Sequence, residues 1–133
     1  MKYVLFLSLL LVTTGVFAHD YSFINDSLFI GTWKGESLCQ VKSSPCHDEI
    51  AAYHISKGDK PNTFHFTMNK MVIGVEEDMG VLDYIYDSST GTFTCIDDKR
   101  KLIWKFKVKN ETMEGTLVYN NVLYRVIKLT KAK

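Results

Sequence analysis

The residues best suited to chemistry stand in one run, Cys46-His47-Asp48-Glu49, whose side chains are of the types that bind metal ions. Consecutive residues on a strand point to alternate faces of a sheet, so four neighbours cannot all face one ion. Cys46 also has a disulfide partner available in Cys39, a short connection earlier. We therefore interpret the run as the solvated start of a strand, and the sequence predicts neither a metal site nor a cofactor.

Two histidines, His54 and His65, lie on predicted strands and would be neighbours if those strands pair. His54 beside a carboxylate is the only plausible start of an enzyme site. No nucleophile–base pair, paired carboxylates or glycine-rich phosphate loop stands out. The charged runs 76–78 and 99–101 are short and typical of solvated turns. We therefore predict that the protein is not an enzyme.

The N-terminal segment predicts export. Lys2 is followed by a nearly unbroken apolar run over 4–12, and then by Val16-Phe17-Ala18, which has the pattern that a signal peptidase accepts. The apolar run is shorter than the roughly 20 residues that span a bilayer. We predict a signal peptide over 1–18, a single domain over 19–133, and a secreted or periplasmic location.

The charge balance argues against polyanionic partners. The chain has a formal net charge of +1, and removal of Lys2 with the signal peptide brings it to zero. We therefore expect no nucleic-acid partner. No second long apolar run follows the signal, so no transmembrane segment is expected after cleavage. A protein partner is not specified by the sequence.

Export implies that the cysteines can form disulfides, because disulfides persist in oxidising compartments. Cys39 and Cys46 flank a turn-like segment that a bridge would close as a short loop, so we predict a disulfide between them. Cys95 is left over as either a small buried hydrophobe or a reactive thiol, and no neighbouring base is visible to activate it. Asn25 and Asn110 begin Asn-x-Ser/Thr sequons, which matter only in a eukaryotic secretory pathway.

Alternating apolar and polar residues dominate the chain after residue 30, as in the segment 63–72, where Phe64, Phe66 and Met68 share one face. Turn residues such as Asn120-Asn121 separate these alternating segments. The predicted strands cover 30–40, 49–57, 63–72, 76–86, 92–97, 101–108, 112–119 and 122–130.

Connections this short exclude parallel pairing, which needs long crossovers. A meander leaves two open edges unless it closes on itself. We therefore predict an all-β fold, an eight-stranded antiparallel up-and-down barrel, with a two-sheet sandwich as the main competitor. Before the first strand, Asn25 and Asp26 can cap a short helical turn at 26–29, which would pack Leu28 and Phe29 against one barrel end.

The first predicted strand carries Gly31-Thr32-Trp33, and the last carries Arg125. This combination resembles the calycin superfamily of lipocalins, fatty-acid-binding proteins and avidin-like proteins, whose opening strand has a Gly-x-Trp after a short helical turn. The resemblance implies a lipocalin-like barrel in which Trp33 closes one end and Arg125 packs over it. The C-terminal helix of lipocalins has no counterpart in the predicted elements.

An eight-stranded barrel is either filled by its own side chains or holds one small ligand. Alternation places a set of large side chains inside, and these would form the ligand site of a hollow barrel. They are Phe64, Phe66, Met68, Tyr84, Tyr86, Phe93, Trp104, Phe106, Met113 and Leu117.

Two hypotheses of function follow. In the first, a secreted or periplasmic barrel binds a small apolar or aromatic molecule in its interior. In the second, a filled barrel without a ligand acts through its surface as a protein-interaction, inhibitor or envelope-structural module. An exposed apolar patch would support the second, and outward-facing Leu38, Tyr53, Ile55 and Val126 are expected to contribute to it.

Overall fold

The computed structural model describes residues 25–133. The predicted signal peptide and its cleavage site after Ala18 lie outside the described residues. Within those residues, no helix has the length and apolar character needed to cross a membrane.

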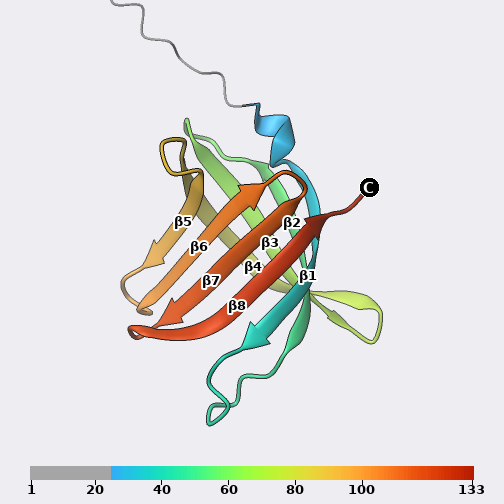
Figure 1. Ribbon diagram of the computed structural model, residues 1–133, viewed down its shortest axis with the longest axis vertical. Coiled ribbons are helices and arrows are strands. Elements are labelled where there is room, and N and C mark those ends of the chain that lie inside the picture. Colours follow the sequence, from blue (N-terminus) through green and yellow to red (C-terminus); the bar gives the residue numbers. More distant parts are fainter. Residues whose placement is uncertain (1–24) are drawn as a thin grey trace, which may run out of the picture.

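Eight antiparallel strands form a closed barrel in which each strand pairs with the next along the chain and β8 pairs with β1 (Figure 1). The predicted up-and-down barrel is therefore confirmed, and the sandwich is excluded. The strands are β1 (Gly31–Cys39), β2 (Glu49–Lys57), β3 (Thr63–Val72), β4 (Val75–Asp87), β5 (Thr92–Asp97), β6 (Leu102–Lys109), β7 (Thr112–Tyr119) and β8 (Val122–Lys131).

A short 3-10 helix, η1 (Asp26–Leu28), lies at one end of the barrel (Figure 1). Asn25 caps it, accepting a hydrogen bond from the backbone N–H of Ser27 at 3.3 Å. Phe29, directly after the helix, is buried, as predicted, but Leu28 is exposed. The turn therefore packs one apolar side chain, that of Phe29, against the barrel end instead of the two that were predicted.

The half of the barrel below η1 is filled with aromatic rings. Phe29 lies 5.8 Å from Phe64 and 5.0 Å from Phe93, measured between ring centroids, in edge-to-face arrangements. Deeper in, Phe66 stacks on Tyr84 at 4.1 Å. These rings come from strands far apart in sequence, so their packing closes this end of the barrel to any ligand.

Trp33 is fully buried at this end and donates a hydrogen bond from Nε1 to the Phe29 carbonyl at 2.8 Å. The expectation that Arg125 packs over it is wrong. β1 and β8 are antiparallel, so the start of β1 pairs with the end of β8, and Trp33 pairs with Lys131. The Lys131 ammonium lies 5.7 Å from the indole centroid, whereas Arg125 pairs with Cys39 at the other end of β1.

Two irregularities interrupt the strand register. The pairing of β3 with β4 shifts between Thr67 and Asn69, where Met79 and Gly80 of β4 lie opposite the single residue Met68. The pairing of β7 with β8 shifts after Leu117, where Tyr124 is the extra residue. Beyond the first bulge, β3 and β4 continue as a long hairpin that projects from the barrel (Figure 1).

Candidate functional site

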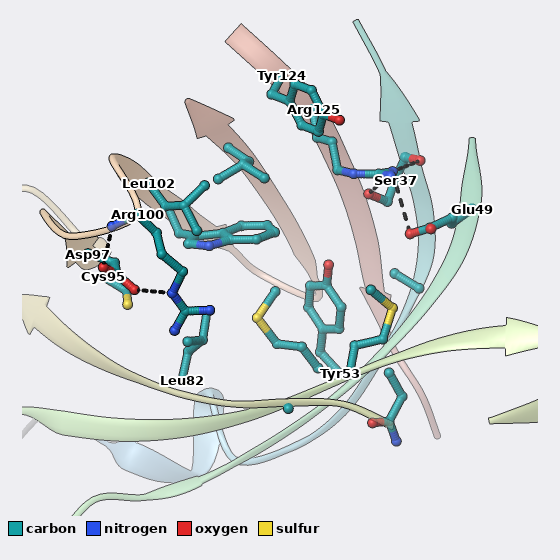
Figure 2. A pocket seen from close by; sticks show the side chains of 17 residues that line it. Ser37, Glu49, Tyr53, Leu82, Cys95, Asp97, Arg100, Leu102, Tyr124 and Arg125 are labelled. Atoms are coloured by element: carbon teal, nitrogen blue, oxygen red, sulfur yellow. Dashed lines mark hydrogen bonds and ion pairs between the residues drawn. The ribbon is translucent and has the colours of Figure 1, made fainter. Parts of the chain in front are cut away.

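The half of the barrel away from η1 is hollow. It holds a cavity of about 320 Å³, near the lower end of the size range of about 300–1,000 Å³ for small-molecule sites. Side chains from most of the strands point into it (Figure 2). The lining residues are Ser37, Glu49, Ala51, Tyr53, Met68, Asn69, Met79, Gly80, Leu82, Cys95, Asp97, Arg100, Leu102, Trp104, Leu117, Tyr124 and Arg125.

Both register irregularities border this cavity. The bulge in β4 places two consecutive residues, Met79 and Gly80, on the lining, and the bulge in β8 adds Tyr124 beside Arg125. A regular strand would alternate these residues between the two faces. Bulges of this kind change the direction of side chains and are common next to functional sites. The backbone irregularities therefore shape the cavity wall.

A polar cluster forms one side of the cavity. Arg125 donates from Nη1 to the carbonyl oxygen and the hydroxyl of Ser37, both at 3.2 Å, and to the carbonyl of His47 at 3.1 Å. The same nitrogen lies 3.5 Å from a carboxylate oxygen of Glu49. Arg125 and Glu49 are mostly buried, so this end of the cavity holds a neutral, hydrogen-bonded ion pair.

The hydroxyl of Tyr53 points into the middle of the cavity (Figure 2). Burial raises the pKa of Tyr53 well above its ordinary value, although the positive charge of Arg125 opposes the shift. The phenol therefore stays protonated and offers a neutral hydrogen-bonding group to whatever occupies the cavity.

An aromatic platform forms the apolar side. Trp104 on β6 stacks on Phe106 with an interplanar angle of 11° and a centroid separation of 6.3 Å. Phe106 in the filled half of the barrel therefore supports the Trp104 ring, which also lines the cavity in the hollow half. Leu117 on β7 is the direct pairing partner of Trp104 and extends this apolar surface.

The cavity reaches the surface near the turn between β5 and β6. Asp97 accepts hydrogen bonds from the backbone N–H and from Nε of Arg100, at 2.9 and 2.7 Å. These bonds, the backbone one first, lower the pKa of Asp97. Cys95 also lines this region, and burial raises the pKa of its thiol, with the Asp97 and Asp83 charges adding to the shift.

The predicted ligand-binding set divides between the two halves. Met68, Trp104 and Leu117 line the cavity. The other residues pack in the filled half, where they contact one another rather than open space. These are Phe64, Phe66, Tyr84, Tyr86, Phe93, Phe106 and Met113.

Two residues expected on the outer surface are inside. Tyr53 and Ile55 are buried, and they follow the inward alternation of β2. Leu38 and Val126 are half-buried. The exposed aliphatic side chains lie elsewhere, most prominently at the tip of the β3–β4 hairpin, where Ile73 is 99% exposed.

A hydrogen-bonded chain of side chains links β1, β2, β3 and β4. His54 Nδ1 lies 3.0 Å from the Thr32 hydroxyl, and its Nε2 lies 2.6 Å from Glu76. Asn69 donates to the same Glu76 oxygen at 2.9 Å. These bonds, that of His54 first, lower the pKa of Glu76. The chain ties the β3–β4 hairpin to the barrel wall, and Asn69 is its one member that also lines the cavity.

No three His, Cys, Asp or Glu side chains among residues 25–133 are grouped so that they could hold a metal ion. In the run that begins at Cys46, Asp48 accepts a hydrogen bond from the Cys39 backbone N–H at 2.8 Å, and Glu49 faces Arg125. The predicted disulfide between Cys39 and Cys46 is confirmed, and Cys95 is the free cysteine of the described chain.

Comparison of the sequence with protein-family models and with curated proteins finds no match.

Proposed function

We propose that this protein is an exported, lipocalin-like barrel that binds a small apolar or aromatic molecule in its cavity. One observation carries the proposal: a barrel with a rigid aromatic half keeps its other half hollow. A cavity lined by Trp104, Leu117 and other apolar groups, with a few polar groups such as Tyr53 and Arg125, is the usual composition of a small-molecule site. Membership of the calycin superfamily is part of this proposal.

The location is supported by the cysteines. A disulfide between Cys39 and Cys46 is stable in an oxidising compartment and rare in a reducing one. Together with the signal-like sequence at the N-terminus, it supports a secreted or periplasmic protein.

Native mass spectrometry of the protein purified from its source tests the proposal directly. We expect a non-covalent adduct that is lost on denaturation. A variant that fills the cavity gives an independent test: Ala51 is buried and lines the cavity, so Ala51→Leu places its added carbons in the open volume. This variant should fold with unchanged circular dichroism and lose the adduct. An Ala51→Leu protein that keeps the same adduct would place the ligand elsewhere.

A second candidate, a protein-interaction module, is favoured by the exposed aliphatic tip of the β3–β4 hairpin. Ile73 and Val75 are 99% and 68% exposed, and Val72 lies beside them. Isolated exposed apolar residues are normal, but a contiguous group on a projecting hairpin is not. If this hairpin carries the function, Ile73→Asn abolishes it in a cellular assay, whereas Ala51→Leu has no effect.

A further inference from the structure

The cavity has two arginines, and their surroundings differ. The Arg125 side chain is 12% exposed, and its charge is matched by Glu49, which is 14% exposed. An anionic ligand placed beside Arg125 would also meet the Glu49 carboxylate where little water screens the repulsion. The buried end of the cavity therefore suits a neutral polar group.

Arg100 lies at the surface, where its side chain is 69% exposed. It bonds to Asp97 only through its backbone N–H and Nε, and within residues 25–133 neither terminal guanidinium nitrogen donates a hydrogen bond. The side chain runs from the β5–β6 turn along the cavity toward Leu82 on β4 (Figure 2). The terminal nitrogens, the edge that binds carboxylate or sulfonate in a bidentate manner, are thus available.

The barrel wall is split where Arg100 lies. β4 and β5 pair only over Ile85–Asp87 and Thr92–Thr94. Beyond Thr94, β5 continues to pair with β6 as far as Asp97, but it no longer pairs with β4. The bulge of β4 at Met79 and Gly80 lies on the same side of the cavity. The cavity thus has a lateral mouth between the two strands, with Arg100 on its rim.

We propose that the ligand is an amphiphile with a compact aromatic body and an anionic group, which binds with its body on Trp104 and its anionic group at the mouth between β4 and β5, on Arg100. This inference rests on the proposed function and adds the ligand class and its orientation. The volume of about 320 Å³ suits a body of a few rings rather than a long chain. The Asp97 side chain is only 23% exposed, but the Arg100 side chain is 69% exposed, so an anion on the terminal nitrogens of Arg100 stays in contact with water, which weakens its repulsion by Asp97.

Two fluorescent probes with the same rings test the charge requirement. 1-Anilinonaphthalene-8-sulfonate carries a sulfonate, and N-phenyl-1-naphthylamine does not. We expect the anionic probe to bind the wild-type protein more tightly. Arg100→Gln should weaken the binding of the anionic probe about three- to tenfold, which lies between the loss of an exposed ion pair and that of a charge-assisted hydrogen bond. The affinity of the neutral probe should change by no more than about twofold. Lys99→Gln, which removes the same charge from the same turn without touching the cavity lining, is the matched control and should change neither.

A second variant, Asp97→Asn, is expected to raise the affinity for the anionic probe. Asp97→Asn keeps an oxygen that can accept the hydrogen bond from the Arg100 backbone and removes the negative charge beside the mouth. It should tighten the anionic probe and leave the neutral one unchanged. Raising the salt concentration from about 0.01 to about 0.15 M, which shortens the screening length from about 30 to about 8 Å, should weaken only the anionic probe, and less so in Arg100→Gln.

The outcomes separate the inference from the proposed function. Equal affinity for both probes, or unchanged binding of the anionic probe by Arg100→Gln, would overturn the inference and leave a binding cavity. An Arg125→Gln variant that folds and alone removes the preference for the anionic probe would reverse the orientation and likewise overturn it. If the wild-type protein binds neither probe and carries no adduct, the proposed function itself fails.

Discussion

Arg125 on β8 and Glu49 on β2 meet across β1, with 3.5 Å between Nη1 and the carboxylate oxygen. Ser37 of β1 lies between them and accepts from Arg125 through both its carbonyl and its hydroxyl. Three adjacent strands are thereby linked at the end of the barrel where apolar packing is replaced by a cavity.

Breaking this pair from one side should destabilise the fold. Arg125→Met leaves Glu49 largely buried without its partner, and we expect a loss of about 1–3 kcal/mol in the free energy of unfolding, below the range for fully buried pairs. Urea unfolding of Arg125→Met, Glu49→Gln and the double variant measures the coupling. The double variant should lose less than the sum of the two single variants, whereas additive losses would show that the two side chains do not interact energetically.

Lys131 is expected to hold η1 onto the barrel. Its ammonium donates to the carbonyls of Ser27 and Leu28 at 2.8 and 3.0 Å and lies over Trp33. Lys131→Ala should cost about 0.5–2 kcal/mol, since it removes a cation–π contact and two charge-assisted hydrogen bonds at a half-exposed site. Lys128→Ala, on the outer face of the same strand, is the control and should stay within about 0.5 kcal/mol. Equal losses in chemical denaturation would contradict this role.

The fold could be predicted because each local signal agreed with the others. Segments such as Phe64-His65-Phe66 alternate apolar and polar residues, which predicts strands. The short polar turns between these segments allow only antiparallel pairing of consecutive strands. The same alternation correctly placed Trp104 and Met68 inside. It could not show which inward residues meet one another and which meet a cavity, because that depends on the register between strands.

Much of the cavity lining was missed for a related reason. Met79, Gly80 and Tyr124 reach it through bulges, which break the period of two on which the prediction relied. Arg125 was assigned to the wrong end because the resemblance gave its strand but not its position along β1. The direction of β8 carried that information: a residue near the start of the last antiparallel strand must lie far from Trp33, which is near the start of the first.

The thiol of Cys95 should react slowly. Burial raises its pKa above that of a free cysteine, and the nearby Asp97 charge raises it further, so less thiolate is present at a given pH. The rate of alkylation by iodoacetamide, followed against pH, should rise with a midpoint higher than that of a free cysteine. Asp97→Asn should lower this midpoint. An alkylation midpoint in the wild-type protein below that of a free cysteine, about 8.5, would indicate an activated thiol instead.

Glu76 should titrate below its ordinary pKa of 4.5, because the hydrogen bond from His54, and then that from Asn69, favours the carboxylate. A group whose pKa is lowered in the folded state stabilises the fold above its unfolded pKa, and this contribution is lost as the pH falls through the folded value. The Glu76 carboxyl shift in an NMR titration measures the midpoint. His54→Phe should move it upward, and an unchanged midpoint would show that the His54 hydrogen bond does not lower the pKa of Glu76.

Ile73 at the tip of the β3–β4 hairpin adopts a φ of 50°, in the left-handed region that β-branched residues avoid. Its side chain is 99% exposed, so it gains no burial in return. Ile73→Asn relieves the strain, since Asn tolerates this conformation, and should raise the free energy of unfolding by about 0.5–1.5 kcal/mol. Val75→Asn, at an exposed position within β4, should not stabilise the protein. If thermal unfolding shows no increase in the stability of Ile73→Asn, the backbone at Ile73 is not strained.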